Sequence, residues 1–147
     1  NNCVEISLNH KMDTINAAML LVSFKYFKKK IQKLKKVRRY YDKNLDQGIA
    51  KQLIRKFETP GMYYYPIKLK QRNKIKKYLN TIGIETKIWN DPLISDSPAY
   101  KSSKIIKLPI ANKILKETLN IPFHEKLSSK ELKYVVDNLN LSFRKFS

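Results

Sequence analysis

The sequence predicts an α+β fold, with a long N-terminal helix packed on a small three-stranded sheet and further helices. Three observations lead to this prediction. Apolar residues recur at gaps of three and four along residues 11–45, as they do on one face of an α-helix. Residues 62–69 are rich in Tyr and Ile, and residues 84–89 alternate apolar with polar, as strands do. The C-terminal region also carries a helical apolar pattern.

The long helix has a clear start signal and no internal breaker. Asp13 precedes the periodic segment, and its carboxylate is suited to accept a hydrogen bond from a free first-turn N–H group. No Pro or Gly occurs in residues 14–45, and Gly48 is available for a left-handed position after the helix. Such a helix is about 45–50 Å long at roughly 1.5 Å per residue, so we expect it to bend or to project. A basic block is expected to lie mostly off the apolar stripe; it consists of Lys28, Lys29, Lys30, Lys33, Lys35, Lys36, Arg38 and Arg39.

Shorter elements are predicted beyond residue 48 from periodicity and from the Gly and Pro positions. They are helical turns at 49–57, a strand at 62–69, a helix at 72–80, a strand at 84–89, a helix at 110–117, a strand at 118–123 and a helix after Ser128. We expect residues 62–89 to form a β-α-β unit, with Pro66 at a sheet edge or a bulge. Pro109 suits a first helical turn, Ser128 and Glu131 form a capping box, and residues 140–147 should fray.

The charge of the chain leaves two interpretations open. Its 147 residues are 42% hydrophobic, enough for one domain with a core, and its net charge is +19. Such an excess suggests a polyanion partner, and Tyr63, Tyr64 and Tyr65 offer rings on which nucleic-acid bases stack. On a strand, however, only Tyr63 and Tyr65 share a face. The charge also comes mostly from lysines spread along the chain, which equally describes a solvated surface.

Several classes of active site are not supported by the residue inventory. Cys3 is the single cysteine, and His10 and His124 are far apart, so a metal site is not expected. Glycines occur only at positions 48, 61 and 83, which excludes a Gly-rich phosphate loop. No signal peptide or membrane-spanning run is visible, so we expect a cytoplasmic location and no membrane partner. Taken alone, the chain lacks a self-sufficient active site.

Four segments follow one another in an informative order. They are LNHKMDTINAA (8–18), the strand and helix with Arg72 (63–79), GIET (83–86) followed by Pro92-Leu93 and Pro98-Ala99-Tyr100, and LNIPFH with LSSKEL (119–132). Together they resemble the C-terminal part of the DegT/DnrJ/EryC1/StrS family, the pyridoxal-phosphate-dependent sugar aminotransferases. The resemblance implies transamination of a nucleotide-linked keto-sugar, with glutamate as amino donor, in polysaccharide or cell-surface glycan biosynthesis.

The resemblance also implies roles for particular residues. Asn9 corresponds to the Asn that reaches the cofactor phosphate in this family, and Lys11 stands where the family usually has Arg. Trp89 and Asn90 belong to a segment that borders the sugar-nucleotide pocket. No lysine matches the motif of the Schiff-base lysine, so no catalytic residue is expected here.

The expected division of the chain follows from the same resemblance. Residues 1–12 are a lead-in loop, residues 13–45 the long helix and residues 62–139 the α/β part of a small C-terminal domain. The large domain that binds most of the pyridoxal phosphate is absent, so we expect the chain to be inactive alone and to need a homodimer or a complementing large-domain chain. A small basic nucleic-acid-binding protein, or a stand-alone scaffold, is the alternative.

Overall fold

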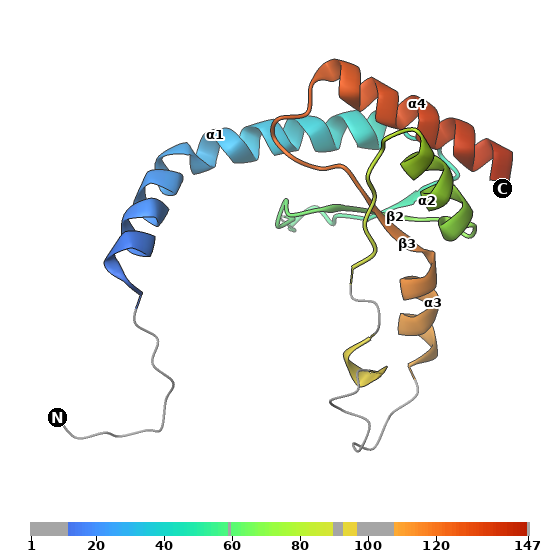
Figure 1. Ribbon diagram of the computed structural model, residues 1–147, viewed down its shortest axis with the longest axis horizontal. Coiled ribbons are helices and arrows are strands. Elements are labelled where there is room, and N and C mark those ends of the chain that lie inside the picture. Colours follow the sequence, from blue (N-terminus) through green and yellow to red (C-terminus); the bar gives the residue numbers. More distant parts are fainter. Residues whose placement is uncertain (1–11, 59, 90–92, 97–107, 147) are drawn as a thin grey trace.

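The structure is a computed structural model that describes residues 12–58, 60–89, 93–96 and 108–146. The described part is an α+β fold (Figure 1), as predicted. In chain order its elements are α1 (Thr14–Asn44), β1 (Ala50–Lys51), β2 (Tyr65–Lys68), α2 (Arg72–Thr81), the 3₁₀ turn η1 (Ile94–Asp96), α3 (Pro109–Glu117), β3 (Thr118–Ile121) and α4 (Ser129–Phe146).

Helix α1 begins as predicted and projects from the rest of the domain (Figure 1). The Asn16 N–H donates a 2.8 Å hydrogen bond to the Asp13 carboxylate, which confirms the N-cap. Figure 1 also shows α1 changing direction in its N-terminal half. There the Ser23 hydroxyl donates to the Met19 carbonyl (2.9 Å), the kind of back-bond that often bends helices.

The end of α1 differs from the prediction. The helix ends at Asn44, Leu45 is extended, and the positive-φ glycine of the described residues is Gly83 rather than Gly48. Gly48 matters for space instead of for its backbone angle. A Cβ atom there would lie 2.8 Å from ring carbons of Phe143 in α4, so only glycine lets the two segments approach this closely.

Two of the predicted elements around the sheet were wrong. Residues 49–57 contain strand β1 instead of helical turns, because Ala50 and Lys51 pair antiparallel with Lys68 and Ile67. Residues 84–89 make a single bridge, Lys87 to Asn120, and therefore form no β-α-β unit. The chain at that point is still tied to α2, whose residue Lys76 donates to the Thr86 carbonyl (2.8 Å).

Pro66 lies in the central strand and not at an edge, since the sheet order is β1-β2-β3. Strand β2 pairs antiparallel with β3, with Pro66 opposite Asn120. The short strand β1 reaches only Ile67 and Lys68. No β1 ladder bond is therefore required at Pro66, which explains how proline is tolerated there.

The hydrophobic core lies between the sheet and helices α1, α2 and α4, and α3 contributes no buried residue to it. Figure 1 shows α3 on the opposite side of the strands from α1 and α4. The capping box is confirmed: Glu131 N–H donates to the Ser128 hydroxyl (3.2 Å), and Ser128 N–H donates to the Glu131 carboxylate (2.8 Å). Residues 140–146 do not fray, because Ser142 is buried and Phe146 packs against the core.

Candidate functional site

A hollow of about 540 Å³ opens between the strands and the N-terminal end of α4. It is bordered by the segment before β2, the 83–89 segment that follows α2, and the end of β3. Its lining is rich in aromatic rings, namely Tyr63, Tyr64, Trp89, Phe123 and Tyr134. Such a mainly apolar concavity with a few polar groups is the usual form of a small-molecule site.

Trp89 lies at the rim of this hollow and is 44% exposed. Its ring centre is 6.4 Å from that of Tyr63, and the Lys87 ammonium lies 6.0 Å from the Trp89 ring. Trp89 also lines a second hollow, of about 410 Å³, between α3 and the outer face of the sheet. An indole placed between two hollows presents a flat apolar surface to a ligand in either one.

Asn120 is a polar side chain of this hollow that the sequence alone does not mark as functional. It lines both hollows although it is only 5% exposed, and its amide nitrogen donates to the Lys87 carbonyl (3.2 Å). Its side-chain oxygen has no hydrogen-bond partner among the described residues. A buried acceptor without a donor costs free energy unless a ligand or water supplies one. No short sequence pattern identifies Asn120 as a buried polar residue, because its burial depends on its pairing with Lys87.

The other polar groups around the hollow are largely engaged in structural hydrogen bonds. The Glu131 carboxylate accepts from the Ser128 hydroxyl and N–H, and these bonds lower the pKa of Glu131 from its ordinary value. The Tyr134 hydroxyl donates to the Ile82 carbonyl (3.1 Å), and His124 Nδ1 accepts from the Lys126 N–H (3.3 Å). The hollow is therefore equipped to bind a ligand more than to transform one.

The sequence-predicted site residues fall into two groups. Asn9, Lys11 and Asn90 lie outside the described residues, so only Trp89 is placed. Trp89 lies at the rim of the hollow and not in the core.

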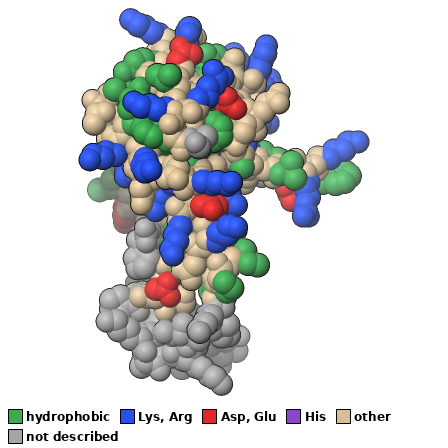
Figure 2. Space-filling model, turned by 90° about the vertical axis from the view of Figure 1, so that its right-hand side faces the viewer, with side chains coloured by type: hydrophobic (Ala, Val, Ile, Leu, Met, Phe, Trp, Pro, Cys, Tyr) green, Lys and Arg blue, Asp and Glu red, His purple; other side chains and the backbone are tan. Residues whose placement is uncertain are grey.

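The three consecutive tyrosines do not form a stacking platform. Tyr65 is 1% exposed and its hydroxyl donates to Asp42 (2.5 Å), so its ring belongs to the core. The rings of Tyr63 and Tyr64 meet edge to face, at 78°. On the face shown in Figure 2, lysines and arginines are scattered among hydrophobic and neutral side chains. Neither the tyrosine rings nor the basic side chains on this face form the continuous cationic groove that single-stranded nucleic acid requires.

Arg38 belongs to the basic block of α1, but unlike Lys36 and Arg39 it does not lie at the surface. It is buried, with its guanidinium carbon 5.4 Å from the Tyr65 ring centre and its Nε 3.6 Å from Asp42. Its Nη2 donates to the Gln52 carbonyl (3.4 Å). Hydrogen bonds and an acidic partner thus compensate for the burial of its charge.

The described residues do not by themselves form a Schiff-base site or a metal site. None of the lysines in the described part is buried, whereas a lysine that reacts with an aldehyde is usually desolvated. No group of three His, Cys, Asp or Glu residues is arranged to hold a metal ion there. None of the helices described is long and apolar enough to cross a membrane.

Comparisons with known proteins point to one family. The model of the DegT/DnrJ/EryC1/StrS aminotransferase family matches residues 2–140. The chain is 26% identical over 133 residues to the UDP-2-acetamido-2-deoxy-3-oxo-D-glucuronate aminotransferase of Pseudomonas aeruginosa, covering 90% of this chain and 37% of that relative. Nothing in the matches points to nucleic-acid binding.

Solved structures agree with the sequence matches. A DegT DnrJ EryC1 StrS aminotransferase from Brucella abortus has a TM-score of 0.86 at 22% identity, over 97% of this chain and 39% of that one. The Streptococcus pneumoniae protein Spr1654, described as a sugar aminotransferase, has a TM-score of 0.80 in its PLP form at 25% identity, over 92% and 36% of the two chains. The chain thus spans well under half the length of these proteins, and it matches their C-terminal part.

Proposed function

Because the chain belongs to the DegT/DnrJ/EryC1/StrS aminotransferase family, we propose that it is the C-terminal small domain of an aminotransferase acting on a nucleotide-linked keto-sugar. The match over residues 2–140 is the observation that carries this proposal. We place residues 1–12 as a lead-in loop, 13–45 as the long helix and 62–139 as the α/β part. Glutamate as amino donor, a cytoplasmic location, a dimeric enzyme and a role in polysaccharide or cell-surface glycan synthesis belong to the same proposal.

The cofactor of this family is pyridoxal phosphate, which acts as an electron sink when the amino group is transferred. In our proposal most of its binding site, including the lysine that holds it, lies in the part of the enzyme that this chain does not span. None of the lysines in the described part is buried, which supports that division. Asn9 is proposed to donate to the cofactor phosphate and Lys11 to add positive charge near it. The chain alone is then inactive.

The hollow beside Trp89 is our candidate for contact with the substrate. The indole offers an apolar face for a sugar ring or a base, and Asn120 offers a buried acceptor for an N–H or O–H donor. Asn90 follows Trp89 directly and is proposed as a second contact. The hollow's volume, about 540 Å³, is within the usual range for a small-molecule pocket of roughly 300–1,000 Å³.

The sole tryptophan of the chain makes this site directly measurable. Titration with UDP-N-acetylglucosamine should change the Trp89 fluorescence saturably, whereas free N-acetylglucosamine at the same concentration should not. Replacing the neighbouring ring (Tyr63→Ala) should weaken the response at least fivefold. Tyr26→Ala removes a tyrosine that is also exposed but lies on α1, and it should leave the response unchanged. Equal responses to the sugar and the nucleotide-sugar, or no response to either, would remove Trp89 from the substrate site.

A further inference from the structure

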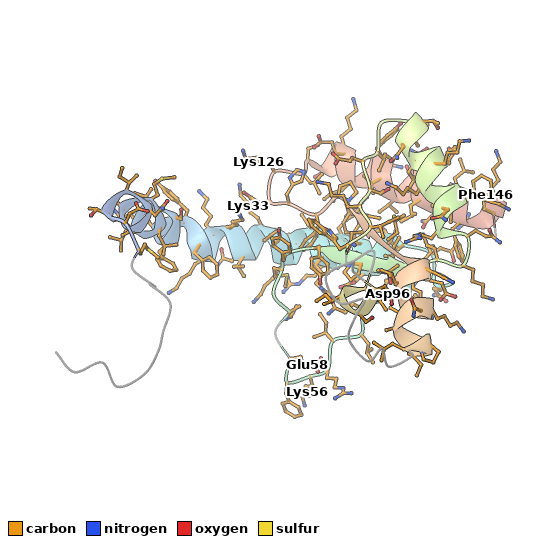
Figure 3. All side chains as sticks on the ribbon, turned by 60° about the horizontal axis from the view of Figure 1, so that its bottom comes forward. Lys33, Lys56, Glu58, Asp96, Lys126 and Phe146 are labelled. Carbon is orange, nitrogen blue, oxygen red and sulfur yellow. The ribbon has the colours of Figure 1, made fainter. Side chains whose placement is uncertain are left out.

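A small hollow lies between the C-terminal half of α1 and the loop that joins β1 to β2. Its volume is about 220 Å³, and its lining consists of Arg38 from α1 with Gln52 and residues 60–64 from the loop. Figure 3 shows this loop, marked by Lys56 and Glu58, projecting away from the sheet and the helices. The hollow is distinct from the one beside Trp89, although Tyr63 and Tyr64 line both.

Arg38 is the charged side chain among the lining residues, and it is only 6% exposed. Its Nη2 donates to the Gln52 carbonyl at 3.4 Å, and its Nε lies 3.6 Å from the Asp42 carboxylate. Both distances exceed the roughly 2.7–3.2 Å of an ordinary N–H···O hydrogen bond. A guanidinium carries five N–H groups, so most of these donors have no acceptor among the described residues. Asp42 offsets the charge of Arg38, but the buried donors still favour a further acceptor.

The acidic side chains nearby are already engaged in other interactions. The Asp42 carboxylate accepts from the Tyr65 hydroxyl at 2.5 Å. The Glu58 carboxylate, in the loop, accepts from the Arg55 backbone N–H at 3.0 Å and lies 4.0 Å from the Arg55 Nε. Neither carboxylate therefore provides the Arg38 guanidinium with a short hydrogen bond.

The loop backbone is strained where it borders the hollow. Met62 has a φ of 50°, in the left-handed region that favours glycine. The N–H groups of Gly61, Met62 and Tyr63 donate to no backbone carbonyl of the described residues. Strained backbone persists where the surrounding structure holds it in place, and it clusters at binding sites. Unused backbone donors thus belong to the same residues that line the hollow.

We propose that this hollow binds a small organic carboxylate, which the Arg38 guanidinium holds. The planar fork of an arginine matches the two oxygens of a carboxylate. The volume of the hollow is below the roughly 300 Å³ at which ordinary ligand pockets begin, so a nucleotide does not fit. Most of the other lining side chains are apolar or aromatic, namely Pro60, Met62, Tyr63 and Tyr64. Such a lining suits a carboxylate on a short apolar stem.

The local charge favours a monoanion over a phosphate. Arg38 and Asp42 form one neutral pair, and the Lys51 ammonium lies 3.0 Å from the Asp42 carbonyl. These three groups leave a single positive charge in excess. A carboxylate balances that charge, whereas a doubly charged phosphate would leave a partly buried negative charge without a partner. This binding does not require the proposed function.

The test is a titration of the full chain with sodium butyrate at constant ionic strength, followed by NMR at the arginine Nε–H signals. The Arg38 signal should shift saturably, with a dissociation constant on the order of 1–10 mM for so small a ligand. Butyramide, which has the same shape without the charge, should cause no shift. Arg39 is the next residue and is exposed, so its signal is an internal control that should stay fixed. Equal shifts with butyrate and butyramide, or none with either, would overturn the proposal.

Two matched substitutions test the role of the guanidinium. Arg38→Lys keeps a positive charge beside Asp42 but removes the fork, so it should weaken butyrate binding at least tenfold, measured at the Met62 backbone amide signal. Arg39→Lys is the control and should bind butyrate as the parent chain does. Unchanged affinity in Arg38→Lys would contradict the proposal. If that variant does not fold, the comparison of butyrate with butyramide on the parent chain decides alone.

Inorganic phosphate tests the class of anion. At the same ionic strength, sodium phosphate should bind at least tenfold more weakly than butyrate, as judged from the Arg38 Nε–H signal. Phosphate that binds as tightly as butyrate, or more tightly, would overturn the assignment to a carboxylate.

Discussion

The Tyr65 hydroxyl of β2 donates a 2.5 Å hydrogen bond to the Asp42 carboxylate of α1. The buried Arg38 guanidinium lies beside both groups, 3.6 Å from Asp42 and 5.4 Å from the centre of the Tyr65 ring. This cluster joins the C-terminal half of α1 to the central strand of the sheet. The helix is thereby held firmly at one end while its other end projects.

Loss of the Tyr65 hydroxyl should destabilise the domain measurably. A hydrogen bond to a charged acceptor contributes about 1.5–3 kcal/mol, so we expect Tyr65→Phe to lower the free energy of unfolding by about that amount. Tyr63→Phe is the matched control, because its ring is exposed, and it should change stability by less than about 0.5 kcal/mol. Urea denaturation measures both. Equal stability of the two variants would show that the Tyr65–Asp42 bond does not hold β2 to α1.

The buried tyrosines predict a loss of stability at high pH. Burial raises the pKa of Tyr41 above its ordinary value, and its hydroxyl donates to the Pro122 carbonyl (2.7 Å). Above about pH 10 the unfolded chain releases this proton while the folded chain keeps it, so stability is complete below about pH 10 and falls as pH rises.

The Tyr41→Phe variant isolates this effect, because it differs from the parent chain only by that hydroxyl. Between pH 10 and 11 the parent chain should lose up to about 1.4 kcal/mol more stability than the variant. Denaturation curves across this pH range provide the measurement. Parallel pH profiles for the two proteins would mean that the Tyr41 hydroxyl titrates normally in the folded state.

The contact between Gly48 and Phe143 predicts an asymmetry between two glycines. Gly48→Ala places a methyl group 2.8 Å from the Phe143 ring, and we expect this overpacking to cost about 1–3 kcal/mol. Gly61→Ala has no described atom within 4 Å of the new methyl group and should be close to neutral. Thermal unfolding of both variants tests the close packing of α4 against the turn that follows α1. A neutral Gly48→Ala variant would contradict that packing.

The capping box gives a local test at the start of α4. Ser128→Ala removes the hydroxyl that accepts from the Glu131 N–H, which should cost about 0.5–2 kcal/mol. Lys130→Ala, two residues on and exposed, is the control. If both variants unfold at the same temperature, the cap contributes nothing beyond what water supplies.

Local signals account for the part of the fold that the sequence predicted. Asp13, Pro109 and the Ser128–Glu131 pair act within a few residues of themselves, so they were readable without the tertiary structure. The long apolar repeat of α1 is also a local signal, so it could be recognised from the sequence.

The misassigned elements depend on distant partners. Ala50 and Lys51 are a strand only because β2 lies beside them, and a two-residue segment has no periodicity of its own. Residues 140–146 remain helical because Phe146 reaches Tyr78 in α2, with ring centres 6.3 Å apart. A contact between residues so far apart in the sequence cannot be recognised from a local sequence pattern.

Part of the candidate site could be predicted from the sequence, and part of it depends on partners remote in sequence. Trp89 was found through a family resemblance, and the hollow beside it explains why the ring is only partly buried. Asn120 and Arg38 were missed because polar residues are expected at the surface, and each is buried by partners remote in sequence: Lys87 for the first, Gln52 and Tyr65 for the second.

The central claim is that this chain supplies one part of an aminotransferase whose cofactor lysine lies in another part. The direct measurement is incubation of the full chain with pyridoxal phosphate, followed by borohydride reduction and peptide mapping by mass spectrometry. The claim predicts scattered, substoichiometric labelling of the exposed lysines. One lysine labelled to one equivalent per chain would contradict it.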